Sequence, residues 1–327
     1  MASIQKRKGV WQVRIRVSGY PTLTKSFDNQ RSAKVWATAK EHELLRGVSQ
    51  DDSCARTTTL GQLIERYLAE VTPLMKSAHE DGYRLRALQR MPICKHTLLN
   101  LTPAIVAKHR DHRLKSVAAG TVIRELAYIS SAINHARREW SINISNPVQM
   151  VRKPPSPEGR NRSLTQDEFE GLLLALSPVG RRNVWTKPVV QLALETAMRR
   201  GELLSLRWEY IDLDSRTAHL VNTKNGEGRT VPLSTGAIQI LKSLPRKEGA
   251  VVFPIKYFTL DAAFKRAVLR AGLKNFRFHD LRHMAITAMA KKLPNVIELS
   301  AVSGHKSLAM LKRYYHPNVQ ELAMKLG

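Results

Sequence analysis

Apolar and polar residues alternate near the start of the chain, where the apolar positions are Trp11, Val13, Ile15 and Val17. A period of two is typical of a strand with one buried face and one polar face. A second extended run, TLTKSF at residues 22–27, leads to Asn29, which can cap a helix whose apolar positions continue to Gly47. Residues 1–50 are therefore predicted to form a small module of β-sheet and helix.

Helical periodicity follows a polar, aperiodic stretch, QDDSCARTTT at residues 50–59, which we interpret as a linker. Thr59 can cap one helix, and Thr102 with Pro103 marks the start of another. Apolar residues then recur at alternating spacings of four and three: Val122, Leu126, Ile129, Ile133, Ala136 and Trp140. Because this spacing is typical of a helix packed in a bundle, residues 58–150 are predicted to form a compact, all-helical domain.

A proline-rich and basic segment, RKPPSPEGRNR, separates the helical domain from the rest of the chain. We place a linker at residues 151–162, because the prolines stiffen the segment and no apolar residue of RKPPSPEGRNR anchors it. Thr165 and Glu168 have the spacing of a capping box, which predicts a helix start. VVQLALETAM, at residues 189–198, is apolar enough to be a buried helix.

Short strand patterns follow Trp208: IDLD at residues 211–214, TAHLV at 217–221 and RTVPLS at 229–234. Asn225-Gly226 provides a hairpin turn between the last two, and the pattern is helical again from residue 259. Residues 163–327 are therefore predicted to form a mixed α+β domain. The predicted fold class is mainly α with small β-sheets, in three domains.

The charge of the chain points to a polyanionic partner. Its 53 Lys and Arg residues exceed the 27 Asp and Glu residues, which gives a formal charge of +26 over 327 residues. Such a field attracts polyanions, and nucleic acid is the expected one. Hydrophobic residues at 43% and charged residues at 24% exclude disorder as a description of the whole chain.

Eight basic residues are candidate DNA contacts on the predicted strands, helices and linker: Arg14, Arg16, Lys25, Arg84, Arg86, Lys108, Arg152 and Lys153. The first three are predicted to form an outward row that lies in a DNA groove, because a sheet of two or three strands can enter the major groove. The alternative for each set is a solvated basic face, and the net charge favours phosphate contacts.

The cysteine content and the N-terminal segment indicate the cellular compartment in which the protein is expected. Cys54 and Cys94 cannot make a disulfide framework, and no C-x-x-C pair with a histidine offers a zinc site. The basic N-terminal segment lacks an apolar run before a cleavage site, and no stretch of about eighteen apolar residues occurs. We therefore expect a cytoplasmic protein in a reducing compartment, without a membrane partner.

Three stretches of the third predicted domain combine guanidinium, imidazole and phenol groups: LETAMRRGELLSLRW, FHDLRH and SGHKSLAMLKRYYH. Their order resembles the tyrosine recombinase family, also called the phage integrase family, and the sequence is similar in particular to shufflon-type DNA recombinases. The resemblance implies a site-specific DNA recombinase with a helical core-binding domain and a catalytic domain. The N-terminal module is similar to the arm-binding modules of integrases.

The resemblance also implies roles for individual residues. The catalytic candidates are Arg199, Lys224, His279, Arg282, His305 and the nucleophile Tyr314, with Glu202 in support. Tyr314 is preferred to Tyr315 because it follows His305 by nine residues, the interval that the family uses. Ala197 and Ser303 stand where the family usually has glycine and leucine, and both changes are expected to alter packing rather than chemistry.

The implied reaction explains the residue types. A protein nucleophile conserves the bond energy of the cut strand, and a phenolate is a tolerable leaving group when the reaction reverses. Arg199 and Arg282 can each donate paired hydrogen bonds to the charged oxygens of the transition state. Lys224 can protonate the departing 5′ oxygen, and histidines near their ordinary pKa can hold or move protons. Neither a metal ion nor ATP is expected as a cofactor.

Each candidate also has a plainer interpretation when taken alone. Arg199 and Glu202 have the spacing of a surface ion pair, which is worth under ~1 kcal/mol. His279 and His283 have the spacing of zinc ligands on a helix, although the glutamate of H-E-x-x-H is missing. His305 can simply cap a helix, and Tyr314 can be a core aromatic residue. The order of all the motifs favours the catalytic interpretation.

The family resemblance implies four protomers that bring two DNA sites together and exchange strands through a four-way junction. DNA-bending accessory proteins are further candidate partners, and the C-terminal VQELAMKLG is a candidate helix for contacts between protomers. The predicted N-terminal module favours an integrase over an invertase of the shufflon type. Two alternatives from other classes are a type IB topoisomerase and a non-catalytic DNA-binding protein.

Overall fold

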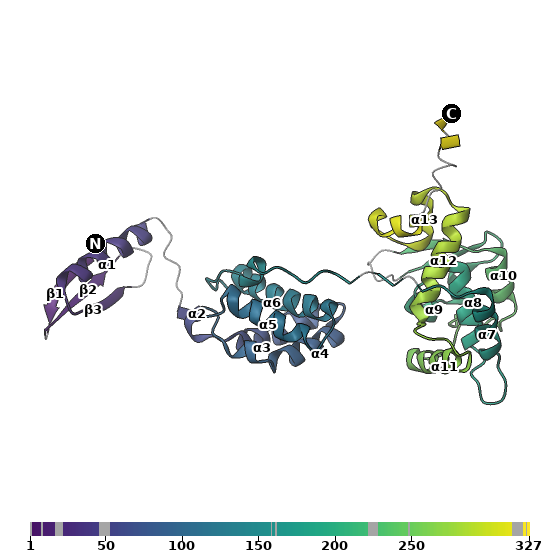
Figure 1. The fold of residues 1–327 in the computed structure, drawn as a ribbon, viewed down its shortest axis with the longest axis horizontal. Helices are drawn as coiled ribbons and strands as arrows, with labels where there is room; N and C mark the ends of the chain where they lie inside the picture. Colours follow the sequence, from purple (N-terminus) through teal and green to yellow (C-terminus); the bar gives the residue numbers. More distant parts are fainter. Residues whose placement is uncertain are drawn as a thin grey trace. The chain divides into compact units, whose positions relative to one another are not determined.

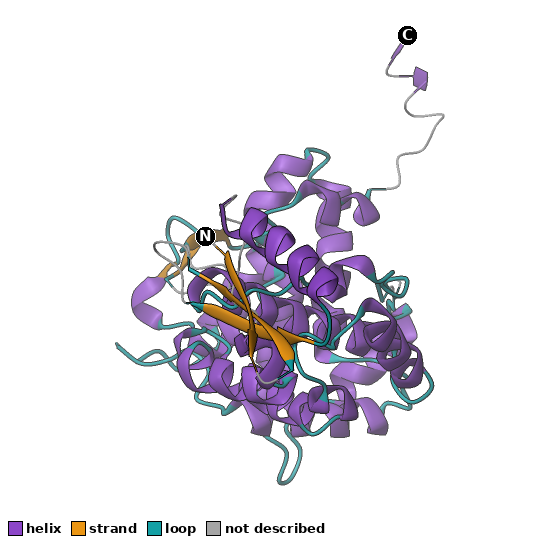
Figure 2. Ribbon diagram, turned by 90° about the vertical axis from the view of Figure 1, so that its left-hand side faces the viewer, coloured by secondary structure: helices purple, strands orange, loops and turns teal. Residues whose placement is uncertain are grey.

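The computed structural model describes residues 2–7, 9–16, 22–45, 53–157, 159–160, 162–221, 228–247, 249–315, 323–324 and 326–327. The chain divides into two compact units, Met1–Glu158 and Gly159–Gly327, which are described separately (Figure 1). Helices predominate and the strands form only small antiparallel sheets (Figure 2). The predicted fold class is thus confirmed, whereas the division into three domains stays a prediction.

The first unit begins with a three-stranded antiparallel sheet in the order β1-β2-β3. Its strands are β1 (Ala2–Arg7), β2 (Val10–Ile15) and β3 (Leu23–Phe27), followed by helix α1 (Gln30–Leu45). Val13 and Ile15 are fully buried against Ala33 and Ala37 of α1. The sequence predicted β2, β3 and α1, but it missed β1, whose residues are mostly polar and exposed.

The register of this sheet corrects one predicted DNA contact. Val13 lies directly opposite Lys25, so both side chains emerge on the face that α1 covers. The Lys25 ammonium lies over the rings of Phe27 and Trp36, at 5.4 and 5.6 Å from their centroids. The prediction that Lys25 shares an outward row with Arg14 and Arg16 is therefore wrong. The opposite face is a polar hollow lined by Ser3, Gln5, Arg7, Gln12, Arg14, Arg16 and Thr24.

The rest of this unit is a helical bundle. Its helices are α2 (Ser53–Thr57), α3 (Leu60–Glu70), α4 (Ala78–Gln89), α5 (Pro103–Leu114) and α6 (Ala119–Glu139). The predicted linker at residues 50–59 is partly wrong, because Ala55 of α2 is fully buried in the bundle core. The predicted caps are confirmed, since the side chains of Thr59 and Thr102 accept hydrogen bonds from backbone N–H groups of α3 and α5.

Some basic residues of the bundle serve its own structure. The Arg113 guanidinium donates to both carboxylate oxygens of the buried Glu125, at 2.7 to 3.2 Å. Arg110 pairs with Asp111 and also donates to the carbonyl of Arg152. These two arginines are therefore engaged within the bundle, whereas the side chains of Arg86 and Lys108 are exposed.

The second unit contains helices and a second small sheet of order β4-β5-β6. Its elements are α7 (Gln166–Ala175), α8 (Thr186–Thr196), α9 (Arg200–Ser205), β4 (Ile211–Asp212), β5 (Thr217–Leu220), β6 (Arg229–Pro232), α10 (Thr235–Lys242), α11 (Tyr257–Arg270), α12 (Phe278–Lys292) and α13 (Val296–Ser303). The capping box of Thr165 and Glu168 is present at α7. The predicted buried helix and the three predicted strand positions are confirmed.

A large apolar core fixes the elements that carry the site residues. It joins α8, α11 and the sheet through fully buried side chains such as Val190, Phe264 and Val231. A smaller cluster lies between α12, α13 and the segment that contains Tyr314. In the part of the chain that the structure describes, no helix combines the length and the apolar character needed to cross a membrane.

Candidate active site

The turn from α8 to α9 places the first predicted arginine. Helix α8 ends at Ala197, whose φ of 51° is left-handed. An alanine in this conformation costs about 1–2 kcal/mol, which explains why glycine suits the position. The next helix starts with Arg199 as its N-cap, and the Glu202 carboxylate accepts hydrogen bonds from the Arg199 backbone N–H and from Nη1, both at 2.8 Å.

Glu202 is the buried centre of an ion-pair network, with 4% of its surface exposed. Arg229, at the start of β6, donates from Nη1 and Nη2 to its two carboxylate oxygens at 2.8 and 3.0 Å. Burial by itself raises the pKa of Glu202, but the hydrogen bonds from Arg229 and from the Arg199 backbone outweigh it and hold the pKa below its ordinary value. Glu202 is therefore a structural anion that fixes Arg199.

The sequence analysis missed Arg229, although the strand pattern contained a signal for it. Arg229 shares the strand period of two with Val231, which is fully buried. Alternation thus places the guanidinium on the inward face of β6. A basic residue in an inward strand position requires a buried anion, and Glu202 supplies it.

Arg282 of α12 is almost fully buried, with 4% of its surface exposed. Its Nη1 donates to the carbonyl of Ala197, and its Nη2 donates to the carbonyl of Ser303 at 2.5 Å. Burial lowers the pKa of Arg282 to about 10, with a further contribution from Arg199. The side chain therefore stays charged at neutral pH and ties the ends of α8 and α13 together.

His305 follows the left-handed Gly304, where φ is 68°. A Cβ atom at Gly304 would lie 2.8 Å from Cζ of Arg229, so a larger residue would displace the guanidinium that pairs with Glu202. The Gly304 carbonyl also accepts a hydrogen bond from Nη2 of Arg199 at 3.3 Å. Burial lowers the pKa of His305 to about 4, and the neighbouring Arg282 and Arg199 contribute, so this imidazole is neutral at pH 7.

Ser303 contacts the imidazole of His305. Its hydroxyl donates to the carbonyl of Leu299 at 2.6 Å. Nδ1 of His305 lies 2.8 Å from the Ser303 hydroxyl oxygen. Because a carbonyl can only accept, the hydroxyl proton points to Leu299, and Nδ1 of His305 must carry the proton of its own contact. The expectation that Ser303 alters packing alone is therefore wrong.

Tyr314 lies at the end of a short 3₁₀ segment, Lys312–Tyr314, with its ring packed against α12 and α13. Its hydroxyl is 2.5 Å from Nδ1 of His283, and the two rings are stacked. Burial raises the pKa of Tyr314 above its ordinary value, although Arg313 and Arg282 oppose the shift. The neighbouring Tyr315 instead donates its hydroxyl proton to the carbonyl of Leu293 at 2.7 Å.

The structure brings most of the predicted catalytic residues into one network of contacts. Arg199, Glu202, Arg282 and His305 are linked by hydrogen bonds, directly or through Ala197, Ser303 and Gly304. Tyr314 packs in the same apolar cluster as Ala197. His279 lies one helical turn before His283, with ring centroids 5.1 Å apart. Lys224 lies outside the described residues. Among the described residues, no group of three or more His, Cys, Asp or Glu side chains is placed to hold a metal ion.

Comparison with known proteins identifies the family. The model of the phage integrase family matches residues 162–321. The shufflon-specific DNA recombinase of Escherichia coli is 39% identical over 280 residues, which cover 83% of this chain and 72% of that protein. A Haemophilus influenzae protein, provisionally named an integrase/recombinase, is 34% identical over 98% of this chain and 89% of its own length.

Solved structures show the same fold. A lambda integrase from a tetramer bound to a Holliday junction matches with a TM-score of 0.65 at 22% identity, over 96% of this chain and 94% of that one. The Tn1549 transposon integrase, in complex with circular intermediate DNA, matches with a TM-score of 0.65 at 16% identity, over 83% of this chain and 100% of that one. With the sequence relatives, these matches confirm the resemblance: the chain belongs to the phage integrase family of tyrosine recombinases.

Proposed function

We propose that this protein is a site-specific DNA recombinase that cuts and rejoins strands through a 3′-phosphotyrosine intermediate at Tyr314. The observation that carries this proposal is the contact of the Tyr314 hydroxyl with His283 of α12, next to Arg282, whose charge acts on the phenol. A nucleophile next to fixed cations is the arrangement that transfer of a phosphoryl group requires. The 39% identity to a shufflon-specific DNA recombinase supports the same activity.

The side chains divide the chemistry among them. Arg199, held by Glu202, would donate to a non-bridging oxygen of the scissile phosphate, and the charge of Arg282 would stabilise the same oxygens. Two Arg282 nitrogens already donate to backbone carbonyls, so its contribution is mainly a fixed charge. His279 and His305 would hold or move protons. Lys224 stays the predicted acid for the departing 5′ oxygen.

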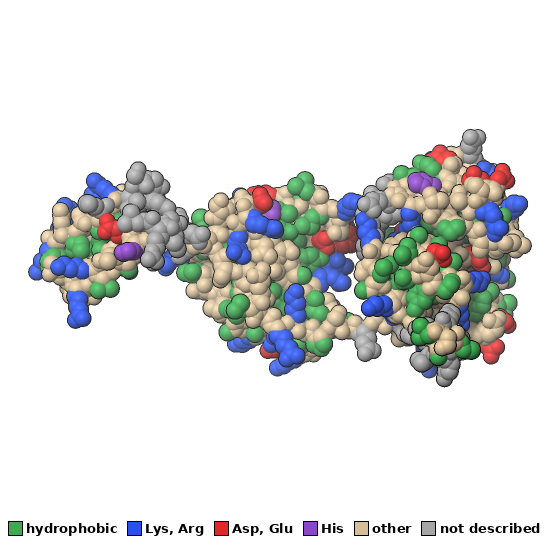
Figure 3. Space-filling model, turned by 90° about the horizontal axis from the view of Figure 1, so that it is seen from above, with side chains coloured by type: hydrophobic (Ala, Val, Ile, Leu, Met, Phe, Trp, Pro, Cys, Tyr) green, Lys and Arg blue, Asp and Glu red, His purple; other side chains and the backbone are tan. Residues whose placement is uncertain are grey.

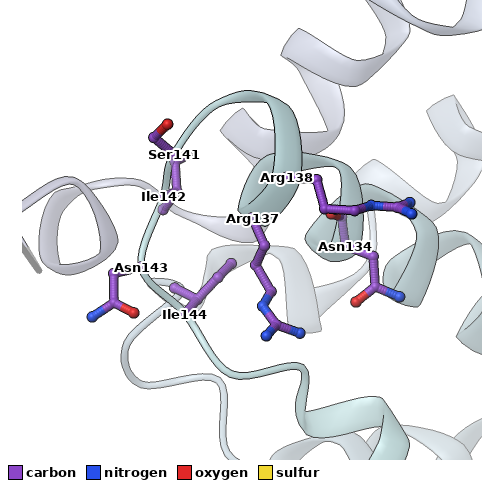
Figure 4. A pocket seen from close by; sticks show the side chains of 7 residues that line it. All are labelled: Asn134, Arg137, Arg138, Ser141, Ile142, Asn143 and Ile144. Atoms are coloured by element: carbon purple, nitrogen blue, oxygen red, sulfur yellow. The ribbon is translucent and has the colours of Figure 1, made fainter. Parts of the chain in front are cut away.

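The N-terminal sheet and the bundle supply candidate DNA contacts. Arg7, Arg14 and Arg16 line the polar hollow of the sheet, which we propose as the arm-site contact. Lys and Arg side chains occur over both units on the face seen in Figure 3. In the bundle, Arg137 and Arg138 line a hollow of about 700 Å³ beside residues 141–144 (Figure 4). Guanidinium groups at such a rim suit phosphate oxygens.

The exposed residues Arg84, Arg86, Lys108, Arg152 and Lys153 stay proposed phosphate contacts. Arg84 also donates to Asp81 and to the Tyr128 hydroxyl, both at 3.5 Å, so part of its charge is already neutralised. Lys25 is not proposed as a contact, because it lies over aromatic rings on the helix-covered side of the sheet.

The active assembly proposed here has four protomers on two DNA sites, as in the lambda integrase tetramer on a Holliday junction. In this proposal, residues 1–50 form the arm-binding module, 58–150 the core-binding domain, and 163–327 the catalytic domain. The boundary between the two compact units lies inside the predicted linker at 151–162.

An integrase with DNA-bending accessory proteins, acting at the bacterial nucleoid, is the favoured subclass. A shufflon-type invertase is the alternative, supported by the 39% identity to the Escherichia coli recombinase.

Covalent capture tests the proposed function even though the target sequence is unidentified. The purified full chain is incubated with fragments of DNA flanking its gene, denatured, and stripped of DNA that is not covalently bound. Sequencing of the retained fragments is expected to show one recurrent site, and Tyr314→Phe is expected to retain none. Recovery without sequence preference would indicate a topoisomerase, and no recovery would refute the proposal. Attachment repeats beside the site indicate an integrase, and clustered inverted repeats indicate an invertase.

A further inference from the structure

His283 contacts the atom that the proposed reaction would activate. Its Nδ1 lies 2.5 Å from the Tyr314 hydroxyl oxygen, within the same chain. The two rings are stacked with centroids 6.0 Å apart, and the His279 ring packs edge to face with the His283 ring. His283 is half-buried, and the hydroxyl of Thr287 donates to its carbonyl at 2.9 Å. The imidazole is therefore held against the phenol by its own helix and by both rings.

The protonation states of His283 and Tyr314 allow the phenol to donate in this contact. Burial lowers the pKa of His283 to about 4, and the nearby His279 and Arg313 contribute to the shift. At neutral pH this imidazole is neutral and can offer a lone pair at Nδ1. The pKa of the buried Tyr314 is raised, so its hydroxyl keeps its proton at rest. In the Nε2–H tautomer of His283, which the proposal below requires, the hydrogen bond runs from the Tyr314 hydroxyl to Nδ1.

We propose that His283 is a catalytic residue that takes the phenolic proton as Tyr314 attacks the scissile phosphate. This inference rests on the proposed function and adds the base to it. The Oη–H bond breaks and the proton moves to Nδ1, while the Oη–P bond forms and the bond from phosphorus to the 5′ oxygen breaks. The 5′ oxygen leaves with a proton from the general acid, for which Lys224 stays the predicted residue. In rejoining, Nδ1 returns its proton to the departing Tyr314 oxygen.

A weak base is sufficient for this transfer. A phenolic proton becomes strongly acidic once its oxygen bonds to phosphorus, so the proton moves to Nδ1 as that bond forms. No free phenolate needs to accumulate. The incoming phosphate also carries a negative charge, which favours the imidazolium form of His283 beside Arg313 and Arg282.

Two substitutions separate proton transfer from positioning. His283→Asn places an amide oxygen near the former position of Nδ1, so it keeps an acceptor for the Tyr314 hydroxyl but cannot take up a proton. We expect cleavage of a nicked suicide duplex, carrying the site recovered by covalent capture, to slow by about 100-fold or more. DNA affinity is expected to stay unchanged. His283→Gln is the second variant and is used for the same measurements if the first does not fold.

The decisive measurement is how the cleavage rate changes when the phenol at position 314 is made more acidic. A fluorinated tyrosine, incorporated at position 314, loses its proton more readily and needs less help from a base. We expect it to recover at least about tenfold of the loss in His283→Asn, and to change the rate of the wild-type chain much less. The same analogue at position 315 serves as the matched control, because the Tyr315 hydroxyl donates to the carbonyl of Leu293.

The outcomes distinguish this inference from the proposed function. Equal cleavage rates in the wild type and His283→Asn would overturn the role of His283 and leave the recombinase function intact. A loss that fluorination at 314 does not reduce would assign His283 to positioning alone and also overturn the proposal. A wild-type chain that never forms a covalent complex would refute the recombinase function and the inference together.

Discussion

Removal of the Arg229 guanidinium is expected to destabilise the catalytic unit strongly. In Arg229→Met, Glu202 loses two of the four hydrogen bonds that its carboxylate accepts, and keeps those from the Arg199 N–H and Nη1. A hydrogen bond to a charged group is worth about 1.5–3 kcal/mol, and breaking a buried ion pair costs about 3–5 kcal/mol. Since Arg199 still neutralises part of the charge, we expect a loss of about 3 kcal/mol in the free energy of unfolding.

A double-mutant cycle isolates this interaction. The variants are Arg229→Met, Glu202→Gln and the double substitution, and hydrogen-exchange mass spectrometry across a urea series follows the unfolding of α8 and α9 in the full chain. We expect a coupling energy of about 2 kcal/mol. A coupling energy below about 0.5 kcal/mol would refute the reasoning, because it would mean that Arg229 and Glu202 do not depend on each other.

The ion pairs of Glu202 also predict how the free energy of unfolding depends on pH. The pKa of Glu202 is lowered in the folded chain, so its ion pairs stabilise the fold fully above the pKa of an unfolded glutamate, about 4.3. This contribution is lost as the pH falls through the lower, folded pKa. Glu202→Gln should therefore show a weaker loss of stability than the wild type when the pH falls from about 5 to about 3.

Three further predictions concern single side chains. Gly304→Ala should destabilise the unit by about 1–3 kcal/mol and lower its melting temperature, because φ is 68° and the new Cβ would meet Arg229. Ser303→Ala should change the imidazole ¹⁵N shifts of His305 from those of the Nδ1–H form, whereas Ser303→Thr should preserve them. Unchanged shifts in the alanine variant would contradict the assigned hydrogen bond. Thr165→Ala should cost about 1 kcal/mol by removing the cap of α7, which urea unfolding can measure.

Local signals in the sequence predicted the elements well where one residue type decides the structure. Thr59, Thr102 and Thr165 cap the helices that their positions indicated. The alternation of apolar and polar residues identified β2, because Val13 and Ile15 both lie on its buried face. The strand β1 could not be found in this way, since a polar edge strand is defined by its pairing with β2 rather than by a buried face.

Contacts between distant segments could not be read from spacing. The predicted outward position of Lys25 is wrong because nothing in the sequence gives the register in which β3 pairs with β2. The motif HDLRH contains His283, but only the packing of the 3₁₀ segment on α12 brings the Tyr314 hydroxyl to it. Likewise, Arg229 acquires its partner through a tertiary contact with Glu202.

Mass spectrometry of the covalent protein–DNA complex tests the central claim most directly. Wild-type protein is trapped on a suicide substrate, digested with protease and nuclease, and the modified peptide is sequenced. The account predicts a nucleotide joined through its 3′ phosphate to the oxygen of Tyr314. A nucleotide on Tyr315 or on any other residue, or a reaction that joins DNA strands without any modified peptide, would contradict it.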